Sequence, residues 1–192
     1  MSAERFAGAQ VPFAHGVFLA RHGETDYNAA RRFQGHLAVP LNARGREQAH
    51  ELAAVAAQRE WATLICSPLL RARETAEIVG AAIGHHPIED ARFAETDCGD
   101  WTDRMFADVQ RDEPELFAAY MRADPDFAFP GGESFVHQQL RVLEGIDAAK
   151  LGPRPALVVS HRGSIRLALA ALYEDDAHRS AAIPNAALVE LP

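Results

Sequence analysis

Short apolar runs separated by amphipathic stretches constrain the fold of this chain more than any other sequence feature. Gly16–Ala20, Thr63–Cys66 and Ala156–Ser160 are four or five residues long and largely apolar, the pattern of strands buried on both faces. A weaker run over 88–93 predicts a short strand, and Ala187–Leu191 predicts the last one. Strands that alternate with helices form a sheet covered on both sides. We therefore expect an α/β fold, a three-layer α/β/α sandwich with a mostly parallel central sheet.

Residues that begin and end helices mark the segments between these strands. Asn42 is a good N-cap, Gly84 supplies a C-terminal stop, and Pro114 suits a first helical turn. The predicted helices span residues 43–59, 70–83, 114–122, 133–150 and 165–173.

Composition excludes several classes of protein. The chain has 27 acidic and 19 basic side chains, a formal charge of −8, whereas a general nucleic-acid binder shows a basic excess. Only Cys66 and Cys98 are present, so this is no disulfide framework, and a reducing cytoplasm is the expected location. The apolar runs are too short to span a membrane, and the N-terminus lacks the pattern of a signal peptide. We expect a flexible lead-in over residues 1–14 and a single domain over 15–192.

Charged and polar side chains gather where the predicted strands end. Arg21 and His22 follow the first strand, Arg71 comes shortly after the second, Glu95 follows the weak strand, and His161 follows the third clear one. Ligands bind at the carboxyl ends of the strands in sheets of this kind. A single histidine at a strand end often does no more than form a hydrogen bond, but convergence of this whole set indicates a functional site.

These residue types suit phosphoryl transfer. The planar fork of an arginine matches phosphate oxygens, and a neutral imidazole such as that of His22 can attack phosphorus. A carboxylic acid, here Glu95, is needed to protonate the departing alkoxide and then to deprotonate water. Gly23 and Gly163 would let backbone N–H groups approach an anion closely.

Taken together, the motifs resemble those of the histidine phosphatase superfamily, the phosphoglycerate-mutase-like group. The similar segments are Arg21–Asn28, Arg32–Ala49, Ser67–Ala76, Glu95–Trp101, Pro130–Ser134 and Ser160–Gly163. The resemblance covers roughly residues 16–191. It implies that His22 is the nucleophile that becomes phosphohistidine and that Glu95 is the proton donor and acceptor. Arg21, Arg71 and His161 would then form the positive phosphate pocket.

The resemblance also implies a wider set of substrate contacts and no metal or organic cofactor. The further substrate-binding residues are Asn28, Gly23, Thr25, Gln34, Gly35 and Gly163. Thr102 and Asp103 depart from the family pattern near the leaving group. Arg162 stands where glycine is frequent, and it either adds positive charge at the pocket rim or points to solvent.

The aromatic segment 104–130 is expected to form a small helical cap over the site, within an insertion at about 102–132. Trp101 would either wall the pocket or pack under it. His36 is either a substrate contact or a solvated loop residue. His85 and His86 lack further metal ligands at suitable spacing and are expected in an exposed turn.

These features predict a metal-independent phosphomonoesterase that hydrolyses small phosphorylated metabolites through a phosphohistidine and releases inorganic phosphate. One alternative is a phosphoglycerate mutase, although mutases of this family tend to carry a larger cap that excludes water. Another is a non-catalytic module that binds phosphorylated ligands. No nucleic-acid or membrane partner is expected. The physiological substrate stays open, as does the choice between a monomer and a homodimer.

Overall fold

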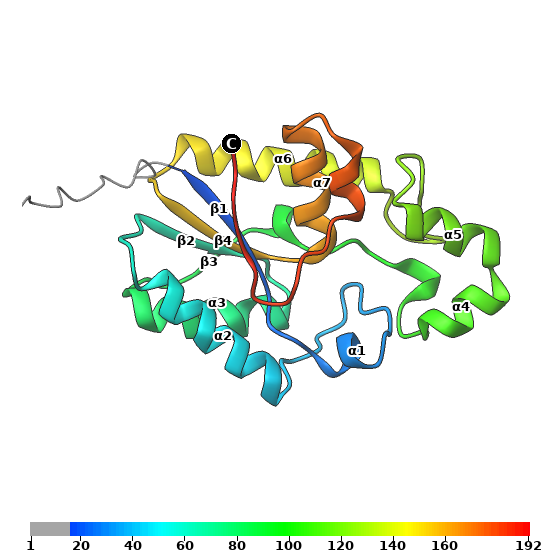
Figure 1. Ribbon diagram of the computed structural model, residues 1–192, viewed down its shortest axis with the longest axis horizontal. Coiled ribbons are helices and arrows are strands. Elements are labelled where there is room, and N and C mark those ends of the chain that lie inside the picture. Colours follow the sequence, from blue (N-terminus) through cyan, green and yellow to red (C-terminus); the bar gives the residue numbers. More distant parts are fainter. Residues whose placement is uncertain (1–15) are drawn as a thin grey trace, which may run out of the picture.

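The predicted strands form one sheet of five in the computed structural model, which describes residues 16–192 (Figure 1). The strands are β1 (Val17–Arg21), β2 (Thr63–Cys66), β3 (Ile88–Glu89), β4 (Ala156–Ser160) and β5 (Leu188–Glu190). They lie in the order β3-β2-β4-β1-β5, and only β5 runs antiparallel to its neighbour. The lead-in predicted over residues 1–14 lies outside the described residues.

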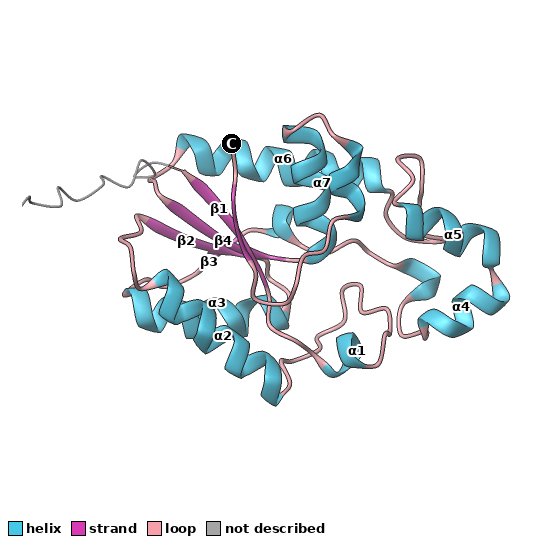
Figure 2. Ribbon diagram, in the orientation of Figure 1, coloured by secondary structure: helices cyan, strands magenta, loops and turns pink. Residues whose placement is uncertain are grey.

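Helices cover both faces of this sheet (Figure 2). One layer consists of α2 (Ala43–Ala56) and α3 (Leu70–Ile83), and the other of α6 (Phe135–Leu151) and α7 (Arg162–Leu172). Successive strand residues point to opposite faces, so Phe18 and Leu157 pack in the core under α2 and α3, whereas Leu19 and Val158 pack in the core under α6 and α7. The predicted three-layer α/β/α fold with a mostly parallel sheet is confirmed.

Two short helices lie beyond one end of the strands, on the right of Figure 1: α4 (Phe106–Asp112) and α5 (Pro114–Arg122). They enclose a cluster of buried aromatic side chains centred on Trp101. We call α4 and α5 the cap. A single turn, α1 (Asp26–Ala29), lies in the loop after β1, and no helix within residues 16–192 is long and apolar enough to cross a membrane.

Several predicted boundaries are confirmed. The segments predicted as helices over 70–83 and 114–122 are α3 and α5, Gly84 ends α3 with a φ of 74°, and Pro114 begins α5. The helix predicted to reach Arg59 ends at Ala56, whose carbonyl accepts a hydrogen bond from the Trp61 indole.

Other predictions were wrong in part. The strand expected over 88–93 ends at Glu89, because the Asp90 side chain accepts the N–H of Arg92 and begins a 3₁₀ turn. The last long helix begins at Arg162, three residues earlier than expected, because the chain turns into α7 directly after β4. Ser134 caps α6, which therefore starts later than predicted. Neither α1 nor α4 was predicted, since both are short.

The loop after β1 packs directly on the start of α2. A Cβ atom on Gly45 would lie 2.0 Å from the Glu24 carbonyl oxygen, and one on Gly23 would lie 2.2 Å from the carbonyl oxygen of Gly45. Only glycines allow this contact between two backbones.

We expect Gly45→Ala to lower the free energy of unfolding by about 1–3 kcal/mol, because the added methyl group must displace the backbone of the loop after β1. Urea denaturation of the purified protein measures this change. Gly152→Ala is the matched control, since its Cβ would meet no atom closer than 3.6 Å. Equal stability of the two variants would contradict the proposed backbone contact.

Candidate active site

Adjacent parallel strands bring the predicted residues to one edge of the sheet. Arg21 at the end of β1 is paired in register with Ser160 at the end of β4. The residues that follow, His22 and His161, have ring centroids 5.1 Å apart. Arg71 lies in the first turn of α3, soon after β2 ends. The sheet order therefore gathers residues that are up to 140 positions apart in the sequence, as Arg21 and His161 are.

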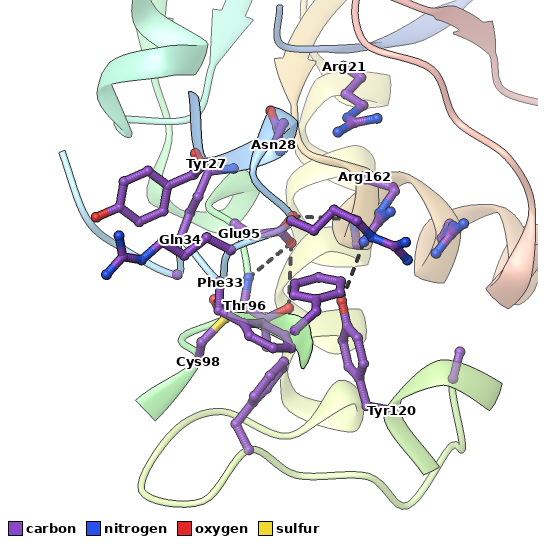
Figure 3. Close-up of a pocket in the computed structure, with 18 of the residues that line it drawn as sticks. Arg21, Tyr27, Asn28, Phe33, Gln34, Glu95, Thr96, Cys98, Tyr120 and Arg162 are labelled. Carbon is purple, nitrogen blue, oxygen red and sulfur yellow. Dashed lines mark hydrogen bonds between the residues drawn. The ribbon is translucent and has the colours of Figure 1, made fainter. Parts of the chain in front are cut away.

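A cavity of about 510 Å³ lies between this edge and the cap (Figure 3). The predicted site residues that line it are Arg21, His22, Asn28, Gln34, Gly35, Arg71, Glu95 and Gly163. His161 is fully buried beside His22, whereas Gly23 and Thr25 lie behind the cavity wall.

His22 is held in the tautomer that a nucleophile needs. Its Nδ1 lies 2.6 Å from the carbonyl oxygen of Gly23, which can only accept, so Nδ1 carries the proton and Nε2 keeps its lone pair. Burial, followed by the charges of Arg71 and Arg21, holds the pKa of His22 well below 6.5. The ring is therefore neutral at physiological pH.

Arg21 and Arg71 place buried positive charge around this histidine. They are 8% and 1% exposed, and burial lowers the pKa of each to about 10, so both remain charged at neutral pH. Arg21 donates to the carbonyl of Ile183 at 2.6 Å, and Arg71 donates to that of Gly35 at 2.9 Å. The Nε atom of each arginine is buried and has no partner within the described part of the chain. A buried donor of this kind is costly unless a ligand satisfies it.

His161 supplies another buried nitrogen without a partner. Its Nε2 lies 2.7 Å from the Oγ of Ser67, which already accepts the N–H of Leu69. If the Ser67 hydroxyl donates to Nε2, Nδ1 carries the ring proton, and this Nδ1 has no partner among residues 16–192. Four buried side-chain nitrogens within residues 16–192 have no hydrogen-bond partner. Three of them belong to the candidate site, namely this Nδ1 and the Nε atoms of the two arginines.

Asn28 and Gln34 are oriented by their oxygen atoms. The side-chain oxygen of Asn28 accepts from the backbone N–H of Thr25 at 3.2 Å and from Asn185 at 3.4 Å. The oxygen of Gln34 accepts from the Thr25 hydroxyl at 2.9 Å. The NH₂ groups of both side chains are thus left for a ligand in the cavity. Thr25 lies behind the cavity wall and holds both side chains through their oxygens.

Glu95 is fixed by hydrogen bonds on both of its oxygens. Oε1 accepts from the backbone N–H of Thr96 at 3.1 Å and from the side chain of Gln138 at 3.0 Å, while Oε2 accepts from the N–H of Gly163 at 3.4 Å. The Glu95 carboxylate lines the same cavity as His22.

Gln138 is one residue of this site that the sequence analysis did not identify; Arg31 and Arg166, which line the cavity, are others. Gln138 is fully buried in α6, and its NH₂ group donates to Glu95 and to Ser164, while its oxygen accepts from the Thr96 hydroxyl. A glutamine within a helix next to another glutamine carries no sequence signal of this role, since such pairs usually face solvent.

The glycines have a different role from the one the sequence suggested. The N–H of Gly23 donates to the Thr75 hydroxyl at 3.1 Å rather than facing the cavity. The N–H of Gly163 donates to Glu95, and a Cβ there would lie 2.5 Å from that carboxylate. Both glycines make room for close packing, and both N–H groups already have acceptors within the protein, which contradicts the predicted contact of these groups with an anion.

The structure resolves three positions that the sequence left open. Trp101 is fully buried beneath the cap, where its indole N–H donates to Glu113, and it does not line the cavity. The ring of His36 forms a hydrogen bond with the backbone carbonyl of Glu95 and does not line the cavity. Arg162 does line the cavity, and its guanidinium lies 3.4 Å from the Tyr120 hydroxyl.

Neither cysteine has the features of a reactive thiol. Cys66 and Cys98 are free and buried, and burial raises the pKa of both thiols, that of Cys66 to about 12. Residues 16–192 contain no group of three or more His, Cys, Asp or Glu side chains that could hold a metal ion, and His85 bonds to a backbone carbonyl.

Comparison with known proteins decides the family. A model of the histidine phosphatase superfamily (branch 1) matches residues 17–192. The chain belongs to the histidine phosphatase superfamily. The resemblance seen in its motifs is confirmed, and the protein is an enzyme of this superfamily.

Its relatives include both phosphatases and mutases. Glucosyl-3-phosphoglycerate phosphatase of Mycolicibacterium vanbaalenii is 37% identical over 165 residues, which cover 81% of this chain and 73% of the relative. Phosphoglycerate mutase-like protein 4 of Arabidopsis thaliana is 33% identical over 180 residues, covering 91% and 76%. Mycobacterial glucosyl-3-phosphoglycerate phosphatase in complex with VO₃ superposes with a TM-score of 0.84 at 31% identity, covering 93% of each chain. The same relative has been solved with inorganic phosphate, at a TM-score of 0.82 and 30% identity over 93% of this chain and 90% of that one.

Burial of a neutral imidazole makes stability depend on pH. The pKa of His161 is held well below 6.5, first by burial and then by Arg71, so the unfolded chain takes up the proton first as the pH falls. The stability that His161 contributes is therefore present above pH 6.5 and lost below it. Between pH 7 and pH 5 the loss reaches at most about 2 kcal/mol.

Between pH 7 and pH 5, we expect the free energy of unfolding of His161→Gln to fall by about 1–2 kcal/mol less than that of the wild type. Urea denaturation at pH 7 and pH 5 measures the difference within each protein, so any general destabilisation by the substitution cancels. His50→Gln removes an exposed histidine and serves as the control. An unchanged pH dependence in His161→Gln would show that the buried ring does not stay neutral.

Proposed function

We propose that this enzyme hydrolyses phosphate monoesters through a phosphohistidine intermediate at His22. The observation that carries the proposal is the state of this histidine, with its Nδ1 proton committed to the carbonyl of Gly23 and its Nε2 lone pair free beside buried, unpartnered arginine Nε atoms. The mycobacterial relatives solved with VO₃ and with inorganic phosphate support phosphate as the ligand of the site.

The phosphoryl group would be held by four side chains. Arg21 and Arg71 contribute two cations, which match the charge of a phosphate monoester dianion. The amide NH₂ of Asn28 and the Nδ1 proton of His161 supply further donors. Phosphate oxygens would thereby satisfy the three buried nitrogens of the site that have no partner in the described protein. Because these arginines supply the positive charge that phosphoryl transfer requires, the proposal includes no metal ion.

In the first step, Nε2 of His22 attacks phosphorus in line with the ester oxygen. The N–P bond forms as the P–O bond to the leaving group breaks, and protonated Glu95 gives its proton to the departing alkoxide. Charge spread over the equatorial oxygens is stabilised by Arg21 and Arg71, already in place before the reaction.

In the second step, water takes the place of the departed alcohol. Glu95, now a carboxylate, accepts a proton from the water as the water oxygen attacks phosphorus. The N–P bond breaks, its electron pair returns to Nε2, and inorganic phosphate leaves. Gln138 is a positioning residue in this scheme, because it keeps the Glu95 carboxylate where both proton transfers occur.

The form of the cavity favours hydrolysis over mutase activity. Its lining includes Arg31, which is exposed, and Met121 of the cap, which is 51% exposed, so water can enter from the cap side. A mutase has to keep water away from its phosphohistidine until the second hydroxyl is phosphorylated. Because some relatives are named as mutases, mutase activity is the second candidate function. The following experiment separates hydrolysis from mutase activity.

We expect phosphate release from phenyl phosphate to persist in EDTA and to fall at least about 10³-fold in His22→Ala, because no other nucleophile replaces Nε2. A phosphate assay on the purified proteins measures this. His50→Ala, on the exposed surface of α2, serves as the control and should retain wild-type rates.

Loss of activity in EDTA that added metal restores would contradict the metal-free scheme, and an active His22→Ala would contradict the nucleophile. Negligible hydrolysis together with bisphosphate-primed conversion of phosphoglycerate would assign the mutase activity instead. Failure of both reactions would leave a phospho-ligand binding module.

A further inference from the structure

Positive charge is concentrated in the cavity of an acidic protein. Seven arginines line the cavity, against two carboxylates, although the whole chain carries a formal charge of −8. Arg21 and Arg71 are accounted for by the proposed phosphoryl group. Arg32 and Arg179 each form an ion pair with an aspartate, at 3.0 and 2.7 Å. The three other arginines of the cavity add more positive charge than one phosphate group requires.

Those remaining arginines are Arg31, Arg162 and Arg166. None of them forms an ion pair with a carboxylate of residues 16–192, whereas most arginines on the outer surface do. Arg166 is held by backbone carbonyls, those of Ala181 at 2.5 Å and Ser180 at 3.2 Å, which orient its guanidinium but do not neutralise it. Arg31 lies at the exposed rim.

Arg162 and Arg166 are unfavourably placed in the absence of an anion. They stand one turn apart on α7, and like charges at this spacing destabilise a helix. Arg162 is also the first residue of α7, at the positive end of the helix dipole. The pKa of Arg166 is lowered by burial and then by the charge of Arg162. An anion bound between the two guanidinium groups would offset their mutual repulsion and the unfavourable interaction of Arg162 with the helix dipole.

Arg162 lies beside both the proton donor of the proposed reaction and the cap, where a leaving group would be bound. The next residue, Gly163, donates to the Glu95 carboxylate, which faces the ester oxygen in the proposed reaction. On its other side, Arg162 reaches Tyr120 of the cap, as the dashed line in Figure 3 shows. Arg162 therefore spans the space between the proton donor and the aromatic residues of the cap.

We propose that the substrate is a phosphate monoester whose leaving group carries a second anionic group, bound by Arg162 and Arg166 with Arg31 at the rim. The second group is a carboxylate or a second phosphate. This inference rests on the proposed function, because it defines the leaving group of that same site. The aromatic side chains of Phe106, Tyr120 and Phe129 line the cavity and would contact the apolar part of the leaving group.

The test compares ligands that differ only in the second charge. We would use the 3- and 4-carboxyphenyl phosphates and their carboxamide analogues, which have nearly the same shape but no second charge. The 1,3- and 1,4-phenylene bisphosphates place a phosphate in the same position. Binding is measured by calorimetry on His22→Ala, which cannot form the N–P bond, so the result does not depend on turnover.

We expect at least one of the doubly charged ligands to bind about tenfold or more tightly than its carboxamide, the effect of one charge-assisted hydrogen bond. Arg162→Gln in the same background should reduce that preference to within about twofold. The matched control is Arg122→Gln, which changes an exposed arginine of α5 outside this cavity and should leave the preference unchanged.

The same ligand pairs are then assayed for hydrolysis by the otherwise wild-type enzyme. The ratio of kcat/KM between each acid and its amide should fall in Arg162→Gln relative to wild type, so differences in leaving-group reactivity cancel. Equal binding of every acid and its amide would overturn the second-anion proposal. A binding preference without hydrolysis would instead refute the proposed function and leave the subsite standing.

Discussion

The uncompensated positive charge of Arg21 and Arg71 is the feature on which the rest of the site depends. Two guanidinium groups are buried at the carboxyl edge of a sheet, and each keeps an Nε without a partner in the described protein. Burial, together with the charges of Arg71 and Arg21, holds the pKa of His22 well below 6.5, which keeps its imidazole neutral. The same charges favour an incoming dianion. In the proposed reaction, this charge would provide both the binding of the dianion and the electrostatic stabilisation of the transition state.

The fold maintains this arrangement by using backbone groups as supports. Carbonyls of Gly35 and Ile183 orient the two arginines without neutralising them, and the carbonyl of Gly23 fixes the tautomer of His22. The carbonyls of Gly23 and Gly35 belong to the segment between β1 and α2, and that of Ile183 belongs to the C-terminal segment, so the site forms only when these two segments pack against the start of α3. The contact between the backbones of Gly23 and Gly45 is one requirement of that packing.

Much of the fold and the site could be predicted, because their signals are local. Strands buried on both faces are continuously apolar, and the residues that follow them lie at one edge of the sheet, where they form the candidate site. Predictions failed where a side chain overrode the pattern, as Asp90 does when it caps a turn and ends β3. The role of Gln138 was missed because it depends on a contact 43 positions away, with Glu95. Gly163 makes room for that same carboxylate, which the sequence spacing does not reveal.

The most direct test of the central claim is to locate the phosphoryl group on the protein during turnover. The enzyme is mixed with an aryl phosphate, quenched within milliseconds in alkali, which preserves the P–N bond, and digested for peptide mass spectrometry. The account predicts a phosphate on the peptide that contains His22, localised to that residue and formed at the rate of turnover or faster. Steady turnover with no phosphorylated peptide, or with phosphate on another residue such as His161, would contradict it.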